Sequence, residues 1–321
     1  MKDEIPADLS PEWRKLHVLH HPIFRKEADG CVWTAPVKRL YCEILRSIVL
    51  RQGAYLEGVT GRGKTCALEL IIPRLPVDLP GLVCISYRER TNQFPSVRAF
   101  FKEFLTVLGH QKRTGETCDI RYRVSRMLEE VALQSPWMMV WLWIDEAQAM
   151  ADYEFLFLRD IQNDLRMMHA DLVVFLSGEA PYFSRRLCEM DECISKSIRE
   201  RFANERLTLD DYQLNDVQDL FAHIDQAVWP VNSEITWTQF FFPVAYEAGY
   251  RLVDDARKCM KALADEKMLQ SDGSCQIRLL RSVVARFFLD NTEQDASGLR
   301  TSLTAWQNAA LDARPSLDEL E

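Results

Sequence analysis

Several features that define other protein classes are missing from this 321-residue sequence. None of its nine cysteines belongs to a C-x-x-C pair, so the spacing does not indicate a zinc site. Several cysteines lie inside apolar runs, where a free thiol behaves as a small hydrophobic side chain. We therefore expect free thiols, no zinc and a reducing cytoplasm.

The sequence also lacks an apolar run long enough to span a bilayer. Its first residues, Met-Lys-Asp-Glu-Ile-Pro, lack the apolar core of a signal peptide. We expect a soluble protein with no membrane partner. Three histidines, His17, His20 and His21, have no cysteine or carboxylate at ligand spacing, so a packed or surface loop is favoured over a metal site.

An excess of positive charge is missing as well, because the formal net charge is -9. This balance argues against a globally basic nucleic-acid binder, and any DNA contact must come from a local patch that oligomerisation concentrates. With 47% apolar residues, the chain can bury one large core or two modest ones.

A complete G-x-x-x-x-G-K-[ST] motif, the phosphate loop, runs from Gly58 to Thr65. Its glycines let backbone N–H groups turn onto a phosphate, and the following helix adds the positive end of its dipole. Lys64 would reach the β- and γ-phosphates, and Thr65 would hold Mg²⁺. The expected nucleotide-binding residues are Gly58, Thr60, Gly61, Arg62, Gly63, Lys64, Thr65 and Cys66.

An unbroken apolar run from Met138 to Ile144 ends in two adjacent carboxylates, Asp145 and Glu146. Such a run is typical of a buried parallel strand, and ligands bind at the carboxyl ends of such strands. Asp145 would hold the metal, and Glu146 would orient the water that attacks the γ-phosphate. The alternative is an ordinary core strand that ends in a solvated turn.

Strands alternate with helices over the first two thirds of the chain, which predicts an α/β fold with a parallel sheet flanked by helices. We expect strands at 54–57, 81–87, 138–144, 171–178 and 205–209, and helices at 35–51, 66–72, 96–108, 119–134 and 153–168. Pro73 and Pro76 should end the helix at 66–72. Ser177 ends the strand beside the acidic one, where it could bond the γ-phosphate or its water; a serine that only begins the turn at Gly178 is the equal alternative.

The pattern turns wholly helical after Asp211. We expect helices near 213–228, 235–249, 252–268 and 276–289, with a short one around Trp306. The expected domains are an N-terminal arm for partner docking, an α/β nucleotide-binding domain, a helical lid and an acidic tail. They cover residues 1–35, 36–211, 212–292 and 293–321.

This arrangement of phosphate loop, acidic strand and helical lid resembles the AAA+ ATPases over most of residues 35–290. The string Ile-Asp-Glu-Ala-Gln at 144–148, with Ser177-Gly178 and Arg199-x-Arg201-Phe202, is most similar to transposition regulators of the TnsC and TniB type, relatives of MuB. Many relatives carry asparagine where Ser177 stands, which leaves room for slow hydrolysis.

The resemblance also implies roles for four arginines. Arg201 falls where the family places the arginine that reaches the neighbouring subunit's γ-phosphate, and Arg199 is the alternative. In the lid, Arg251 lies in the region of the second nucleotide sensor, and Arg257 could serve instead. A surface arginine on a helix remains the alternative for the first pair.

For a relative of TnsC, the resemblance implies an ATPase that needs Mg²⁺ and forms a ring or filament on double-stranded DNA. The subunits would contact phosphates without reading bases, and the assembly would link a target-selection protein to a transposase. The candidate DNA-contacting residues are Arg88, Arg90, Arg98, Lys102, Arg121 and Arg123.

Two other functions remain open. A helicase loader or initiator related to the IstB and Orc types shares the fold, although an initiator should carry a winged-helix module and the residues beyond 290 are too few for one. A signalling or antiphage NTPase would switch conformation without touching DNA. The intact Lys64, Thr65, Asp145 and Glu146 argue against a binding module with a decayed ATP site.

Overall fold

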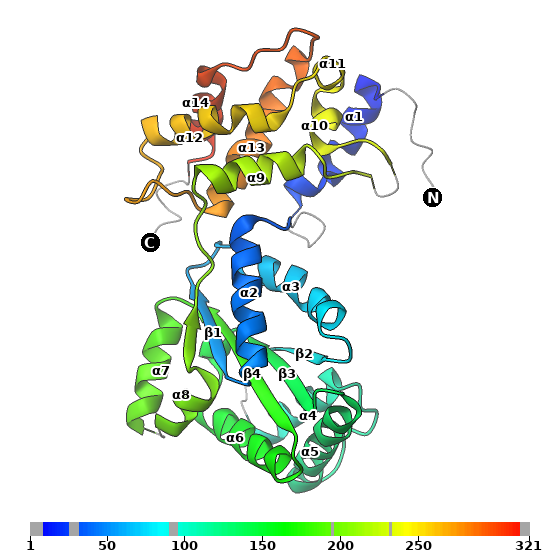
Figure 1. The fold of residues 1–321 in the computed structure, drawn as a ribbon, viewed down its shortest axis with the longest axis vertical. Helices are drawn as coiled ribbons and strands as arrows, with labels where there is room; N and C mark the ends of the chain where they lie inside the picture. Colours follow the sequence, from blue (N-terminus) through cyan, green and yellow to red (C-terminus); the bar gives the residue numbers. More distant parts are fainter. Residues whose placement is uncertain (1–8, 26–31, 90–95, 194–195, 231–232, 315–321) are drawn as a thin grey trace. The chain divides into compact units, whose positions relative to one another are not determined.

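The computed structural model describes residues 9–25, 32–89, 96–193, 196–230 and 233–314 (Figure 1). The chain divides into two compact units. An α/β unit holds residues 39–60 and 67–209, and a helical unit holds residues 1–38, 61–66 and 210–321. No helix among the described residues is long and apolar enough to cross a membrane.

A sheet of five parallel strands forms the centre of the α/β unit. The strands are β1 (Ala54–Gly58), β2 (Val83–Arg88), β3 (Met139–Asp145), β4 (Asp171–Glu179) and β5 (Glu205–Leu207). They lie in the order β2-β3-β4-β1-β5. β3 is buried along its whole length, as its unbroken apolar run predicts. The predicted α/β fold is confirmed.

The register brings the carboxyl ends of three strands to one edge of this sheet. Ile144 pairs with Leu176 between β3 and β4, and Leu56 pairs with Ser177 between β1 and β4. β4 therefore separates the strand that precedes the phosphate loop from the strand that carries Asp145. Ser177 lies beside the acidic strand, as the sequence predicts.

Amphipathic helices accompany the sheet. They are α2 (Ala35–Val49), α3 (Lys64–Asp78), α4 (Val97–Val107), α5 (Thr117–Gln134), α6 (Asp152–Met167), α7 (Tyr182–Cys193) and α8 (Lys196–Phe202). The expectation that Pro73 and Pro76 end the third helix is wrong, because α3 continues to Asp78 with both prolines inside it. Each proline removes one backbone N–H bond and crowds the carbonyl four residues earlier, and the burial of Leu75 in the core helps to offset this cost.

The helical unit has its own apolar core. Its helices are α1 (Pro11–His17), α9 (Leu214–Ile224), α10 (Trp237–Phe241), α11 (Pro243–Glu247), α12 (Ala256–Asp265), α13 (Ile277–Asn291) and α14 (Leu303–Asp312). The single helix expected at 235–249 is divided, since Pro243 occupies the first turn of α11. Trp306 is fully buried and stacks on Phe287 at 3.8 Å, so α14 belongs to this core rather than to a separate tail.

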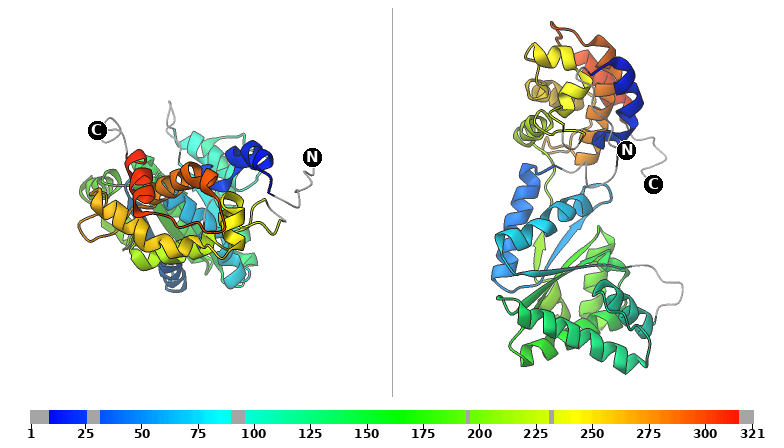
Figure 2. Two further views of the ribbon diagram at one scale, coloured as in Figure 1. Left: turned by 90° about the horizontal axis from the view of Figure 1, so that it is seen from above. Right: turned by 90° about the vertical axis from the view of Figure 1, so that its right-hand side faces the viewer.

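The described part of the N-terminal arm packs on the helices of the same unit (Figures 1 and 2). Arg281 donates to the carbonyl oxygens of Ile23 at 2.9 Å and Pro22 at 3.1 Å. The ring of His21 is fully buried against Phe241 at 4.9 Å, and this burial lowers the pKa of His21 to about 3. The described part of this segment therefore packs on its own chain.

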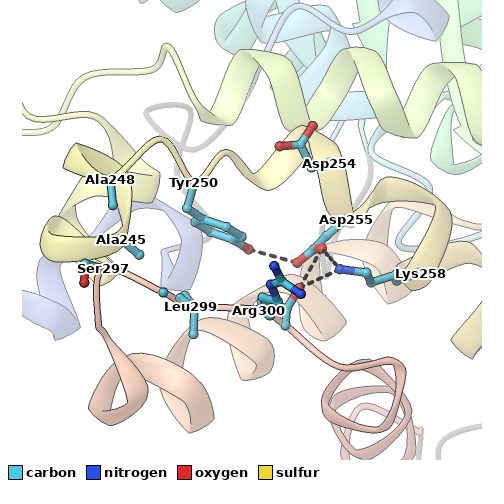
Figure 3. Close-up of a pocket in the computed structure, with 11 residues that line it drawn as sticks. Ala245, Ala248, Tyr250, Asp254, Asp255, Lys258, Ser297, Leu299 and Arg300 are labelled. Atoms are coloured by element: carbon cyan, nitrogen blue, oxygen red, sulfur yellow. Dashed lines mark hydrogen bonds and ion pairs between the residues drawn. The ribbon is translucent and has the colours of Figure 1, made fainter.

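A pocket of about 550 Å³ opens in the helical unit between α11, the start of α12 and residues 297–301 (Figure 3). Asp255 lies beneath it and is 1% exposed. The hydroxyl of Tyr250 donates to its carboxylate at 2.9 Å, and Lys258 Nζ donates at 2.7 Å. Thr301 and Trp306 add two more donors, at 2.6 and 3.3 Å. These bonds fasten the segment before α14 to α12.

Candidate functional site

The acidic end of β3 forms a compact hydrogen-bonded group with β4. Asp145 is 4% exposed, and its Oδ1 accepts a 2.7 Å bond from the hydroxyl of Ser177. The indole Nε1 of Trp143 donates in turn to Ser177 Oγ at 2.7 Å. Trp143 and Asp145 can share this partner because alternate residues of a strand point to one face. Ser177 therefore holds the buried carboxylate in a fixed orientation.

An arginine from β2 completes the surroundings of Asp145. Arg88 is paired in register with Asp145, and its NH2 and Nε lie 3.2 and 3.3 Å from Asp145 Oδ2. The guanidinium lies against this carboxylate, whereas the sequence placed Arg88 among the DNA-contacting residues. The cross-strand register that joins them is a tertiary feature, and the local sequence does not show it.

Glu146 projects from the same edge in an unusual backbone conformation. It is exposed, and its φ and ψ of 58° and 37° lie in the left-handed region, which a residue other than glycine seldom adopts. Such conformations collect at functional sites where the surroundings hold them. Gln148 Nε2 donates to Glu146 Oε2 at 2.6 Å. This contact of the carboxylate was not predicted from the sequence.

The phosphate loop follows β1 and leads into α3. Gly61 and Gly63 both have φ of +84°, where any other residue would be strained. Lys64 is the first residue of α3, so Lys64 and Thr65 lie at the helix end whose free N–H groups favour anions. Arg62 forms a 3.1 Å ion pair with Asp211, whose pKa is raised by burial and lowered in part by Arg62.

Cys66 departs from the sequence expectation. Cys66 is disulfide-bonded, so the expectation of free thiols throughout is wrong at the end of the phosphate loop. Free thiols are present at Cys42, Cys84, Cys118, Cys188, Cys259 and Cys275. Over the described residues, no group of three histidine, cysteine or carboxylate side chains could hold a metal ion.

The two arginines of α8 lie on one short helix. Arg201 NH1 donates to Asn163 Oδ1 at 2.7 Å and to Gln162 Oε1 at 3.3 Å, which attaches α8 to α6 of the same chain. Arg199 is half-buried on the same helix. The recorded contacts of Arg201 are therefore with α6 rather than with the Asp145 group.

The lid arginines differ in what they contact. Arg251 lies 3.7 Å over the ring of Tyr246 and donates to the carbonyls of Tyr246 and Tyr250 at 2.8 and 2.7 Å. Arg257 is exposed on α12. A third arginine, Arg278 at the start of α13, lies against the phosphate loop, since a Cβ on Gly61 would meet its Cδ at 2.7 Å. No sequence motif pointed to Arg278.

Two of the remaining DNA candidates contact the loop between α4 and α5. Arg98 donates to the carbonyl of Gly115 at 2.8 Å, and Arg123 donates to that of Thr114 at 2.7 Å. Arg121 pairs with Asp160 at 3.2 Å. These three guanidiniums thus have partners in the protein. Lys102 is half-buried on α4, and Arg90 lies outside the described residues.

Comparisons with known proteins agree with this geometry. Residues 50–187 match the family model described as an AAA domain. The Aeropyrum pernix ORC1 protein in complex with DNA is 14% identical over 90% of this chain and 68% of its own, with a TM-score of 0.51. Drosophila ORC bound to DNA is also 14% identical, over 99% and 70% of the two chains, with a TM-score of 0.51.

No curated protein matches the sequence. The two solved structures, at their low identity, show likeness of fold alone. The parallel sheet in the order β2-β3-β4-β1-β5, with a phosphate loop after β1 and paired carboxylates at the end of β3, fits the matched domain model. Residues 50–187 therefore match an AAA domain, and the chain has the AAA+ P-loop NTPase fold.

Proposed function

We propose that this chain is an ATP-dependent, DNA-binding AAA+ regulator of DNA transposition. It assembles on duplex DNA with ATP and links a target-selection protein to a transposase. The observation that carries the ATPase part is the group at the end of β3, where Ser177 and Arg88 hold the buried Asp145 beside Glu146. The transposition part rests on the similarity of residues 144–148 and of the Arg199 to Phe202 segment to the TnsC and TniB type.

The residues present fit ATP with Mg²⁺. The buried carboxylate of Asp145 and the hydroxyl of Thr65 would each offer an oxygen of the kind that Mg²⁺ prefers. Mg²⁺ would neutralise charge on the phosphates when bound. Lys64 and the loop N–H groups hold the β- and γ-phosphates, and Ser177 keeps Asp145 in place. Glu146 accepts a hydrogen bond from the attacking water and orients it.

DNA contact on this proposal comes from the basic loop between α4 and α5. Arg98 and Arg123 fix the backbone of that loop through the carbonyls of Gly115 and Thr114. Lys112 and Arg113 in the same loop are exposed. A few phosphate contacts per subunit, repeated along an assembly, add up through counterion release even though the monomer is acidic.

A shared ATP site is the testable core of this proposal. Arg201→Ala should lower ATP hydrolysis by about 10³-fold, because an arginine supplied by a neighbouring subunit stabilises charge on the transferred phosphate. Mixing this variant with Lys64→Ala should restore part of the activity, since the second chain supplies Arg201 to the intact loop of the first. Phosphate release from the two variants, alone and mixed, is the measurement.

Arg199→Ala is the comparison variant, because Arg199 lies on the same turn of α8 and is the alternative finger. Full hydrolysis by Arg201→Ala alone, or a mixture no more active than its two parts, would contradict the shared site at Arg201. A loss confined to Arg199→Ala would move the role to that residue.

A second candidate is an initiator-like or helicase-loading AAA+ ATPase. The fold likeness to ORC1 and ORC structures favours it, and both of those proteins are described in contact with DNA. The two functions differ in what the DNA-bound protein recruits. Stimulation of strand transfer by a transposase supports the first function, and capture of a replicative helicase supports the second.

A further inference from the structure

Gln148 lies between the carboxylate of Glu146 and the end of β4. Its Nε2 donates to Glu146 Oε2 at 2.6 Å, and its Oε1 accepts from the backbone N–H of Glu179 at 3.1 Å. We propose that Gln148 is a positioning residue that holds one oxygen of Glu146, so that the other oxygen is aimed at the attacking water. This inference rests on the proposed ATPase function and assigns a role to a residue outside the phosphate loop and the carboxylate pair.

The orientation of the Gln148 amide is determined by its two partners. A backbone N–H can only donate, so it faces the amide oxygen, and a carboxylate can only accept, so it faces the amide NH₂. Turning the amide over would set oxygen against oxygen at Glu146 and N–H against N–H at Glu179. The bond to Glu146 is charge-assisted, which makes it shorter and stronger than a bond between neutral groups.

The backbone around Gln148 is held by packing. Residues Ala147–Ala149 form a short 3₁₀ turn, and both Ala147 and Met150 are buried in the core of the α/β unit. Gln148 itself is half-buried, while Glu146 is exposed. The more buried residue therefore restrains the more exposed one.

A glycine makes room for this contact. A Cβ placed on Gly178 would lie 2.9 Å from Gln148 Oε1 and 2.6 Å from Cγ of Phe183. Any side chain there would push Gln148 away from the N–H of Glu179, because Phe183 is fully buried and closes the other direction. The close approach requires glycine at this position.

The fixed end of Gln148 is also connected to the strand that leads into the phosphate loop. Glu179 pairs with Gly58 in the register of β4 and β1, and its carboxylate accepts a hydrogen bond from the hydroxyl of Thr60. Hydrogen bonds therefore run in series from Thr60 through Glu179 and Gln148 to Glu146. Glu146 is thereby oriented relative to Thr60, which directly precedes Gly61 of the phosphate loop.

Removing the amide should lower turnover without weakening nucleotide binding. Gln148→Ala frees the Glu146 side chain to sample other rotamers, and misplacement of a reacting group by about 1 Å can cost 10²-fold. We expect kcat for ATP hydrolysis to fall by about 10- to 100-fold. KM, the affinity for a fluorescent ATP analogue and the thermal unfolding temperature should stay as in the unchanged protein, because Gln148 is assigned no phosphate contact.

Two further variants separate positioning from a structural role. Gln148→Glu keeps the shape but replaces the donor with a carboxylate, so it should lose at least as much kcat as Gln148→Ala. In a Glu146→Gln background, Gln148→Ala should cause no further loss, because residues that act as a unit are not additive. Gln134→Ala, at an exposed glutamine on α5, is the control and should leave kcat unchanged.

Normal or raised kcat in both Gln148 variants would overturn the inference, and so would a loss that appears only as weaker ATP binding or a lower unfolding temperature. A further loss in the Glu146→Gln background would also contradict it, since Gln148 would then act elsewhere. Failure of the proposed function looks different, because Glu146→Gln would itself hydrolyse ATP normally.

Discussion

Replacing Lys64 with alanine should weaken ATP binding and ATP-dependent assembly together. Lys64 begins α3 directly after two glycines in the left-handed conformation, where the loop N–H groups and the helix end favour a phosphate. Its ammonium adds the mobile charge that reaches the terminal phosphates. Loss of this charged contact should weaken ATP binding by about 100-fold, equivalent to about 2.8 kcal/mol.

Titration with a fluorescent ATP analogue gives the affinity, and mass photometry with ATP and duplex DNA gives the size of the assembly. Arg74→Ala is the matched control, because Arg74 lies on the same helix and forms an exposed pair with Asp78. Its affinity and assembly should equal those of the unchanged protein. ATP affinity that survives in Lys64→Ala would show that the phosphate loop is not the nucleotide site.

Glu146→Gln should have the opposite pattern, keeping ATP binding and assembly while hydrolysis stops. The amide keeps the size of the side chain but is a poor acceptor for the proton of the attacking water. Groups that serve as general bases contribute about 10²- to 10⁴-fold, so we expect phosphate release to fall by at least about 10²-fold. Assemblies should then persist on DNA, because hydrolysis is the step that releases the subunits.

Phosphate release and the lifetime of assemblies after removal of free ATP are the two readouts for this variant. Glu130→Gln, at an exposed glutamate on α5, is the control for a change of surface charge. Normal hydrolysis by Glu146→Gln would mean that another group orients the water. Loss of assembly in this variant would contradict the separation of binding from hydrolysis.

Two strands of the α/β unit, β3 and β4, were predictable from sequence because each is an apolar run of strand length with a polar end. β3 and β4 begin and end within one residue of the expected positions. Pairing of these two strands also follows from the expectation that Ser177 lies beside Asp145, and their register confirms it. A strand that is buried on both faces consists almost entirely of apolar residues, so the local sequence indicates it.

The helix boundaries were less predictable where tertiary packing overrides a local rule. Pro73 lies inside α3 because the apolar face of the helix continues past it to the buried Leu75. Pro76 follows Leu75 in the last turn of the same helix. The sequence shows Trp306 only as an isolated aromatic residue. In the structure it stacks on Phe287 and Phe221 in the core of the helical unit. Its partners lie far away in sequence, so no periodicity reveals them.

The residues of the candidate site also differ in how well the sequence predicts them. The phosphate loop and the carboxylate pair are short motifs, and the sequence located both. Arg88 and Gln148 contact those carboxylates through sheet register and a 3₁₀ turn, which local sequence does not encode. Arg278 reaches the loop from a helix more than 200 positions later in the sequence, and only the folded unit brings the two together.

Negative-stain imaging of the purified protein with duplex DNA tests the central claim most directly. Samples with and without a slowly hydrolysed ATP analogue, each with and without DNA, form the comparison. Rings or filaments on DNA that require the nucleotide, and that Lys64→Ala fails to form, are the result predicted for an ATP-dependent regulator on DNA. Assemblies that ignore DNA, or the absence of assemblies in every sample, would contradict this function and favour an NTPase that does not bind DNA.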